Sequence, residues 1–294
     1  MNILLLGAGG QLGSEWSSYL PAKGNSVRYK AYGSSDLDIT QSARLKSIFE
    51  AEEPDLVINC AAYTNVDKAE EEPDRARLVN ATAVGFLAGL CSEWGARLIH
   101  YSTDYIFPGL KEDRKRLPAG YPEEHPAAPL NIYGQTKWEG EQAIRESGCS
   151  HLIIRVSWLC GKYGNNFIKT MLRLSEDHSV LKVVDDQWGS PSFTDNVVKN
   201  SYKLIEQEAE GTYHLSSGGL ITWADFAEII FQLTERQTEV QRITSDDFPA
   251  KARRPHFSKL NTDKIEQAHG IEPEDWRTGL ERFINEYTDE DFRH

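Results

Sequence analysis

The sequence predicts an α/β protein in which a doubly wound parallel sheet is joined to a second, smaller α/β lobe. Through the first half of the 294 residues, short apolar runs alternate with amphipathic stretches. Continuous apolar strands separated by helices are typical of a parallel sheet that helices cover on both faces. A glycine-rich turn, GAGGQLG at residues 7–13, stands between the first strand and the first helix. Right-handed crossovers between successive units would then build the doubly wound sheet.

The predicted elements follow in order along the chain. Apolar runs predict strands at residues 3–6, 27–32, 55–60, 97–102 and 151–156, and helical spacing predicts helices at 12–20, 43–53, 73–94 and 133–146. In the second half we expect helices at 166–174, 223–233 and 276–287, strands at 180–184 and 211–215, and a basic loop at 250–255. The proline-rich loop 108–129 is long for a compact domain, which favours a functional lid or rim.

Composition and charge exclude several classes of function. The chain carries 32 Lys and Arg against 45 Asp and Glu, a net charge of −13 that disfavours nucleic-acid and membrane-surface partners. No apolar stretch approaches the roughly 18 residues of a membrane span, and no basic signal-peptide start is present, so we expect a cytoplasmic protein. The four cysteines form no CxxC pair, and buried free thiols are expected for Cys60 and Cys160.

The glycine-rich turn predicts a phosphate-binding loop. Glycines allow the backbone to turn tightly and to approach a pyrophosphate, and the N-terminus of the following helix favours anions. The GxxGxxG spacing is that of short-chain dehydrogenases, and the alternative is a turn without a ligand. We therefore expect residues 1–156 to form an NAD(P)-binding, Rossmann-type domain with a returning segment near 195–206. Residues 157–294 would form the substrate-binding lobe.

Three side chains suggest proton chemistry. Tyr133 and Lys137 are four residues apart, so they share one face of a predicted helix, and the ammonium would lower the pKa of the phenol. This spacing alone is weak, and the alternative is a surface tyrosine and lysine. Thr103 lies at the carboxyl end of a predicted strand, where ligands bind in doubly wound sheets. Its hydroxyl could bond a carbonyl oxygen that Tyr133 protonates, or it could satisfy local backbone.

Together these residues resemble the extended short-chain dehydrogenases that act on nucleotide sugars. The closer resemblance is to the dTDP-4-dehydrorhamnose reductase family, and it extends over both halves of the chain. The segments that carry it are VINCAAYTNVDKAE at 57–70, STDYIF at 102–107, RVSW at 155–158, GNNF at 164–167, DQWGSP at 186–191 and RP at 254–255.

The resemblance implies a role for each matching residue. The residues expected to bind the cofactor are Gly7, Gly10, Gln11, Leu12 and Gly13 at the phosphates, Asp38 and Ile39 at the adenine, Ala61, Ala62 and Tyr63 along the cofactor, and Tyr133 and Lys137 at the nicotinamide end. The residues expected to meet the sugar nucleotide are Thr103, Asp104, Trp158 and Arg254, with Arg253 as a further candidate for the diphosphate. Core packing is the alternative for Trp158, and a solvated turn for at least one of the two arginines.

The implied reaction is the reduction of dTDP-4-dehydro-β-L-rhamnose, with Tyr133, Lys137 and Thr103 as the catalytic residues. The segment after the second strand, YGSSD at 32–36, has no acid at the strand end and no following arginine, so NADPH and NADH both stay open. Rival roles are an epimerase, a 4,6-dehydratase, or a regulatory subunit like that of methionine adenosyltransferase. In the dehydratases Asp-Glu follows the threonine, whereas here Asp104 and Tyr105 do. The expected partner is a small nucleotide sugar, bound by a monomer or homodimer.

The resemblance also suggests a magnesium site. Some members of the family dimerise through magnesium held by acidic side chains, and Glu15, Asp195 and Glu286 stand at positions that match. Oxygen ligands suit this cation. The simpler alternative is three exposed acids on helix surfaces.

Overall fold

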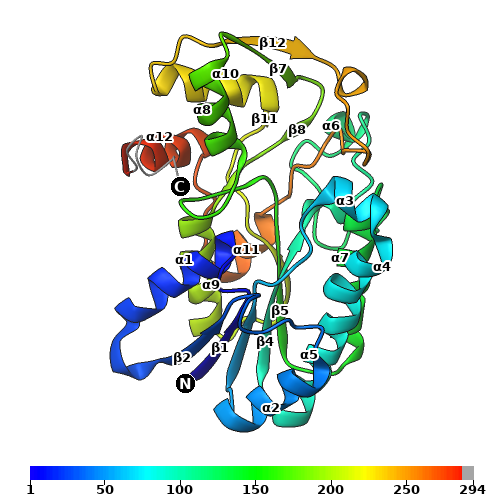
Figure 1. The fold of residues 1–294 in the computed structure, drawn as a ribbon, viewed down its shortest axis with the longest axis vertical. Coiled ribbons are helices and arrows are strands. Elements are labelled where there is room, and N and C mark those ends of the chain that lie inside the picture. The colour runs from blue at the N-terminus through cyan, green and yellow to red at the C-terminus, as the bar shows by residue number, and fades with distance from the viewer. Residues whose placement is uncertain (287–294) are drawn as a thin grey trace.

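Six parallel strands form the central sheet, in the order β10-β5-β4-β3-β1-β2 (Figure 1). Their bounds are β1 Asn2–Leu6, β2 Arg28–Tyr32, β3 Leu56–Asn59, β4 Arg97–Thr103, β5 His151–Val156 and β10 Gly211–His214. This computed structural model describes residues 1–286, apart from the side chains of residues 25 and 26. The order reverses between β1 and β3, and ligands bind at such a switch point, beyond the carboxyl ends of the strands. The predicted doubly wound parallel sheet is confirmed.

Helices cover both faces of the sheet because successive strand residues point to opposite sides. On one face, Ile3 and Leu5 of β1 share a core with α1 (Gln11–Tyr19), α9 (Thr194–Glu206) and α11 (Asp263–His269). On the other, Leu4 and Leu6 share a core with α2 (Ser42–Glu52), α5 (Ala83–Trp94) and α7 (Ile132–Glu146). All four side chains are at most 3% exposed, and burial of each contributes about 1.5–3 kcal/mol.

The sheet also takes up chain from the second half of the sequence. Strand β10 pairs with β5 as the outer strand, and α9 packs against α1. The strand expected at 211–215 therefore belongs to the first sheet, not to the second lobe. The chain returns to the first domain over a longer stretch than the segment expected near 195–206, because β10 joins the sheet as well. The domain boundary at residue 156 stays a prediction.

The helix expected at 73–94 is divided into three parts. Helix α4 (Pro73–Arg77) leads into a π-helical turn, η2 (Leu78–Thr82), which precedes α5. Such turns are rare and frequently lie at functional sites. Asn80 lies in this turn, and its side chain accepts from the Tyr63 N–H at 2.8 Å and donates to the Tyr63 carbonyl at 3.1 Å. The π-helical turn thus holds the chain that leaves β3.

The second lobe lies beyond the carboxyl ends of the strands (Figure 1). Helices α8 (Phe167–Asp177), α10 (Trp223–Leu233) and α12 (Trp276–Glu286) pack with the parallel pair β7 (Val180–Val184) and β12 (Glu239–Ile243). Two short pairs complete the lobe, β6 (Leu159–Cys160) with β9 (Ser192–Phe193) and β8 (Trp188–Gly189) with β11 (Ile221–Thr222). The three predicted helices are present, and residue 287 lies outside the described residues.

Short helical turns connect the larger elements. They are η1 (Leu20–Ser26), α3 (Val66–Glu71), η3 (Asp104–Ile106), α6 (Asp113–Arg116) and η4 (Ser245–Asp247). Within residues 1–286, no helix has the length and apolar character needed to cross a membrane.

The proline-rich loop 108–129 is fastened to the second lobe. The ring of Tyr121 stacks on Phe107 with centroids 4.7 Å apart, and its backbone N–H donates to the Lys259 carbonyl at 2.9 Å. The Arg114 guanidinium lies 3.4 Å from the ring centroid of Trp188. These contacts hold the loop against the second lobe, and its expected role as a lid or rim stays a prediction.

Candidate active site

A cleft of about 580 Å³ opens beyond the carboxyl ends of the strands, toward the second lobe. Its lining brings together predicted residues that are far apart in the sequence: Gly10, Gln11, Leu12, Ala62, Thr103, Asp104, Tyr133, Lys137 and Trp158. They come from the start of α1, the ends of β3, β4 and β5, and the first turns of α7. Among the described residues, the loop 108–129 contributes none of the lining.

Two glycines give the loop after β1 its shape. Gly7 has a φ of +76°, and a Cβ atom there would lie 2.5 Å from the Ala61 nitrogen. A Cβ atom on Gly13 would lie 2.1 Å from the Gly7 carbonyl oxygen. Side chains are excluded from both positions, so α1 can begin close to the sheet. Gly7 and Gly13 therefore shape the loop from outside the cleft lining.

The N-terminus of α1 faces the cleft through Gly10, Gln11 and Leu12. Gly10 is the N-cap residue, and the first turn carries no acidic side chain. Free N–H groups and the positive end of the helix dipole make this position suitable for a phosphate. The Gln11 side chain donates to the Leu159 carbonyl at 3.4 Å, which ties α1 to the start of the second lobe.

Tyr133 and Thr103 meet where α7 begins beside the end of β4. The Asn131 side chain caps α7 by accepting from the Gly134 N–H at 2.8 Å, which fixes the first turn that carries Tyr133. Burial raises the pKa of the Tyr133 phenol, and a hydrogen bond with the Thr103 side chain opposes this shift. The Tyr133 pKa is therefore raised by burial, and the lowering that the sequence predicts from Lys137 is wrong.

Lys137 is fully buried below the cleft floor, at 2% exposure. Its ammonium donates to the Tyr101 carbonyl oxygen at 2.6 Å and lies 3.2 Å from Nε2 of His100. Burial lowers the pKa of Lys137 to about 8, and the Glu141 carboxylate opposes the shift. Glu141 is itself held by the buried Arg155 guanidinium at 2.8 Å.

Asp104 and Trp158 line the side of the cleft that is expected to take the sugar. Burial raises the pKa of the Asp104 carboxyl to about 7, and its Oδ2 atom has no hydrogen-bond partner within residues 1–286. The ring of Trp158 stacks on Trp223 at 3.5 Å between centroids, and its Nε1 donates to Ser258. Trp158 has a φ of +46°, a conformation that costs free energy and is concentrated at functional sites.

The predicted arginines lie outside the cleft lining. Arg254 is half-buried, and it donates to Asp67 at 2.7 Å and to the hydroxyl of Tyr105, a lining residue, at 3.4 Å. Arg253 is exposed, and its carbonyl oxygen accepts from Asn131. Arg254 is thus the arginine next to the cleft.

Four other predicted cofactor residues are also absent from the lining. Asp38 accepts from Thr40 and Arg75, and Ile39 is buried in the core. Ala61 is half-buried behind Gly7, and the hydroxyl of Tyr63 donates to Glu72 at 3.0 Å. Their roles toward a cofactor stay predictions.

The magnesium site expected from three carboxylates stays a prediction. Burial raises the pKa of Glu15, and the charges of Asp195 and Glu286 act on Glu15 in the same direction. Among residues 1–286, no three His, Cys, Asp or Glu side chains are arranged to hold a metal ion. Glu15 accepts from Thr194 at 2.7 Å, and Asp195 is ion-paired with Arg282. The Arg282 guanidinium thus compensates the charge of Asp195, one of the three acids. Glu286 is exposed at the end of α12.

Several lining residues were not assigned a role from the sequence. They include Thr64, Val66, Tyr105, Leu159, Gly164 and Asn165. Most of them stand in segments that carry the family resemblance, which is the signal that could have found them. Cys60, expected as a buried thiol, also lines the cleft, and burial raises the pKa of its thiol, so a reactive thiolate is disfavoured.

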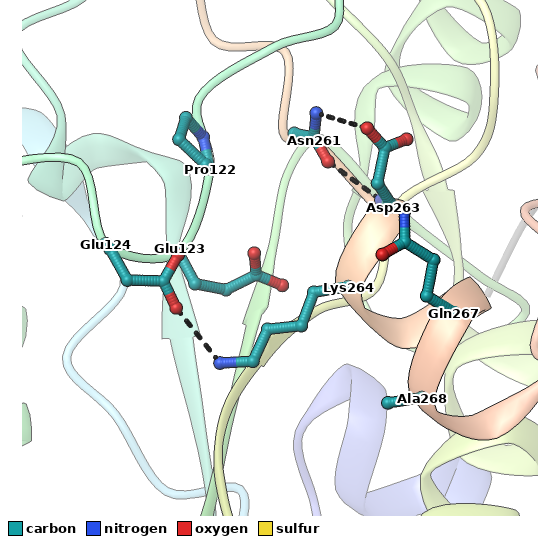
Figure 2. A pocket seen from close by; sticks show the side chains of 8 residues that line it. All are labelled: Pro122, Glu123, Glu124, Asn261, Asp263, Lys264, Gln267 and Ala268. Carbon is teal, nitrogen blue, oxygen red and sulfur yellow. Dashed lines mark hydrogen bonds and ion pairs between the residues drawn. The ribbon is translucent and has the colours of Figure 1, made fainter.

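A second hollow of about 530 Å³ lies between residues 122–124 and α11 (Figure 2). Lys264 reaches across it to Glu124 at 3.2 Å, and Asn261 and Asp263 bond each other. It shares no lining residue with the cleft. Each of its charged side chains already has a partner within the protein, Glu123 accepting from the backbone N–H of His214 at 3.0 Å, so we assign the chemistry to the cleft.

Comparisons with known proteins agree with this geometry. Residues 1–289 match the family described as RmlD substrate binding domain. A dTDP-4-dehydrorhamnose reductase of Shigella flexneri is 39% identical over 97% of this chain and 98% of that protein. A structure of the reductase of that name from Bacillus anthracis, in complex with NADP, is 37% identical with a TM-score of 0.91 over 97% and 99% of the two chains. UDP-glucose 4-epimerase of Thermus thermophilus, 18% identical with a TM-score of 0.79, has the same fold over 100% and 99% of the two chains. The chain belongs to the dTDP-4-dehydrorhamnose reductase family.

Proposed function

We propose that the protein reduces the C4 carbonyl of dTDP-4-dehydro-β-L-rhamnose to give dTDP-β-L-rhamnose, with NADPH or NADH as the reductant. The observation that carries the proposal is the position of Thr103, Tyr133 and Lys137 in one cleft with the N-terminus of α1. A proton donor and a phosphate-binding helix end then face the same bound molecule. The names of the relatives support the choice of substrate.

The residues of the cleft fit a dinucleotide. The phosphates would lie at Gly10, Gln11 and Leu12, where the N-terminus of α1 faces the cleft and Gly10 carries no side chain. At the end of β2, the Asp36 carboxylate accepts from the Gly33 N–H at 3.1 Å, so it is turned back on its own loop. No acid stands directly at the strand end to bind a ribose 2′-hydroxyl and no arginine follows to bind a 2′-phosphate, so NADPH and NADH both stay candidates.

The chain supplies the proton and stabilises the developing charge. When bound, the reduced nicotinamide would supply the hydride to sugar C4. The raised pKa of Tyr133 keeps its phenol protonated at neutral pH, so the hydroxyl can give its proton to the sugar oxygen. Thr103 would donate a hydrogen bond to that same oxygen. Lys137 would hold the ribose hydroxyls next to Tyr133.

The alternatives are less well supported by the residues of the cleft. A 4,6-dehydratase needs a basic carboxylate after the acid that follows the threonine, and Tyr105 stands there with a pKa raised by burial. A purely regulatory subunit would not require a tyrosine, a lysine and a threonine gathered below a phosphate-binding loop. An epimerase on the same scaffold stays the closest alternative.

The decisive experiment incubates the protein with dTDP-4-dehydro-rhamnose and each reduced cofactor, and follows the absorbance of the reduced nicotinamide. We expect oxidation of the cofactor together with formation of dTDP-rhamnose, and loss of both in Tyr133→Phe. Absence of cofactor oxidation with either NADPH or NADH would overturn the proposal. Sedimentation would test the expected monomer or homodimer, and the cytoplasmic location stays a prediction.

A further inference from the structure

A line of three buried polar side chains runs from the sheet to the cleft floor. Asn59 ends β3, His100 lies on β4 and Lys137 lies on α7, and their exposures are 1%, 0% and 2%. Nδ2 of Asn59 lies 3.1 Å from Nδ1 of His100, and Nε2 of His100 lies 3.2 Å from Nζ of Lys137. Only Lys137 has a role in the proposed reaction.

Hydrogen-bond donors and acceptors fix the orientation of this line. The backbone N–H of Ala61 points at Oδ1 of Asn59 at 3.1 Å, and an N–H can only donate. The other end of the Asn59 amide, Nδ2, is therefore a donor toward Nδ1 of His100. Burial and the charge of Lys137 lower the pKa of His100 well below its ordinary value, so the ring is neutral. A neutral imidazole that accepts at Nδ1 carries its proton on Nε2.

The proton on Nε2 of His100 then points at Lys137. An ammonium group has three donors and no acceptor, so the protonated lysine presents N–H against N–H at this contact. The uncharged amine has a lone pair and can accept from His100, while it still donates to the Tyr101 carbonyl at 2.6 Å. The histidine ring therefore favours the amine form of Lys137.

We propose that Asn59 and His100 are positioning residues that set the protonation state of Lys137 by holding a fixed N–H donor against its nitrogen. This inference depends on the proposed function only for the role that Lys137 has in the reaction. The other titratable groups that act on Lys137 are Cys60, next to the end of β3, and Glu141 from its own helix. Tyr133, also from α7, lines the same cleft. Glu141 favours the ammonium, but Arg155 and Arg145 share its charge.

This arrangement predicts a specific pH dependence. Because the pKa of Lys137 is lowered to about 8, the ammonium is present below this pH and is lost as the pH rises through it. Only the ammonium keeps all three donors for the Tyr101 carbonyl and for ribose hydroxyls. Removing the N–H donor of His100 would raise the pKa of Lys137, so the lysine would stay protonated to a higher pH.

Two variants test the proposal in the unliganded protein. His100→Gln places an amide that can turn its oxygen toward Lys137, without adding charge. Asn59→Asp keeps the shape of Asn59 but can only accept, so the imidazole proton would move to Nδ1 and Nε2 would accept from the ammonium. We expect the Lys137 titration to move upward by about one pH unit or more in both variants.

The titration is followed by NMR of the lysine Cε carbons, with the Lys137 signal assigned from its loss in Lys137→Met. This readout does not depend on activity, so its failure is distinguishable from failure of the proposed function. His151→Gln is the matched control, since His151 lies at the far end of β5 and bonds the Cys149 carbonyl, and no shift is expected there.

Each outcome decides the proposal. An upward shift in both variants supports it, together with an alkaline limb of kcat/KM that moves in the same direction. A shift in Asn59→Asp alone would mean that added charge, and not the histidine donor, acts on Lys137, which overturns the proposal. Lower melting temperatures with an unchanged Lys137 titration in both variants would reduce Asn59 and His100 to structural residues.

Discussion

Arg254 donates from Nη2 to Oδ2 of Asp67 at 2.7 Å, so the arginine expected to meet the substrate diphosphate is already paired with a carboxylate. The other oxygen of Asp67 accepts the backbone N–H groups of Lys251 and Ala252 at 3.1 and 3.0 Å. Asp67 thus fastens the basic loop 250–255 to α3. Because the guanidinium has further donors, it can bind a diphosphate while Asp67 holds the loop in place.

Arg254→Ala should raise the KM for the sugar nucleotide by about 10- to 100-fold, because one charge-assisted hydrogen-bonding group is lost from the diphosphate. Turnover at saturation should change little, since the diphosphate is remote from the reacting carbon. Steady-state kinetics with varied substrate measure both. Arg253→Ala is the matched control, and an equal rise in its KM would contradict the assignment to Arg254.

Tyr133→Phe should lower turnover by about 10²- to 10⁴-fold, which is the usual contribution of a positioned acid. The ring stays in contact with Tyr105, whose centroid lies 5.5 Å away, so the folded structure should persist. Cofactor affinity, measured by calorimetry, should stay close to that of the wild type. Near-normal turnover in this variant would remove Tyr133 from the mechanism.

Gly10→Val should weaken dinucleotide binding while the protein still folds. A Cβ atom at Gly10 would lie 3.4 Å from its nearest neighbour, an ordinary contact, and the side chain would occupy the place of the phosphates. Gly13→Ala is the contrasting variant, because its Cβ would lie 2.1 Å from the Gly7 carbonyl oxygen and must distort the loop. Melting temperature and calorimetry separate the two effects, and unchanged cofactor binding in Gly10→Val would make the loop a simple turn.

Local patterns in the sequence identified the elements that carry the chemistry. Apolar runs predicted the five strands of residues 1–156. The carboxyl ends of parallel strands lie at one edge of a sheet, so Gly10, Thr103 and Tyr133 were expected to lie close together there. The resemblance to a family then gave Trp158 and Arg254 their expected places. Both kinds of inference use information that lies within short segments.

Contacts between distant segments could not be predicted in the same way. The pairing of β10 with β5 depends on how the chain returns from the second lobe, and no local pattern encodes that path. The π-helical turn at Asn80 lies within residues 73–94, where the sequence pattern predicted one continuous helix. His100 is a histidine within an apolar strand, and only the fold shows that its ring meets Lys137.

Asp104→Asn should gain stability relative to the wild type as the pH rises. Burial raises the pKa of Asp104 from 3.8 to about 7, so the folded state keeps a proton that the unfolded state has already lost. Stability therefore falls as pH rises between these two values, and the penalty is complete above the folded pKa. The full penalty is on the order of 4 kcal/mol, and the asparagine variant avoids it.

Urea denaturation of both proteins at about pH 5 and about pH 8 measures this difference. Asp38→Asn is the control with the opposite sign, because hydrogen bonds from Thr40 lower the pKa of Asp38. That lowered pKa gives Asp38 a stabilising contribution that is lost only as the pH falls through it, so the variant should show no relative gain between pH 5 and pH 8. A gap between Asp104→Asn and the wild type that is independent of pH would show that Asp104 is ionised throughout.

The ion pairs of Arg282 predict that the wild-type protein does not depend on magnesium. Arg282 pairs with Asp195 and, at 2.8 Å, with Glu274. Asp195, one of the acids that act on Glu15, is therefore already partly neutralised. EDTA should leave the melting temperature and the sedimentation of the wild type unchanged, and elemental analysis should find no bound metal.

Arg282→Ala should lower the free energy of unfolding by about 1 kcal/mol, as expected for the loss of half-exposed ion pairs. Magnesium should restore part of that loss, because a cation would again offset the repulsion among the carboxylates. If EDTA instead dissociated a wild-type dimer, Glu15, Asp195 and Glu286 would be ligands of an ion shared between two copies of the chain.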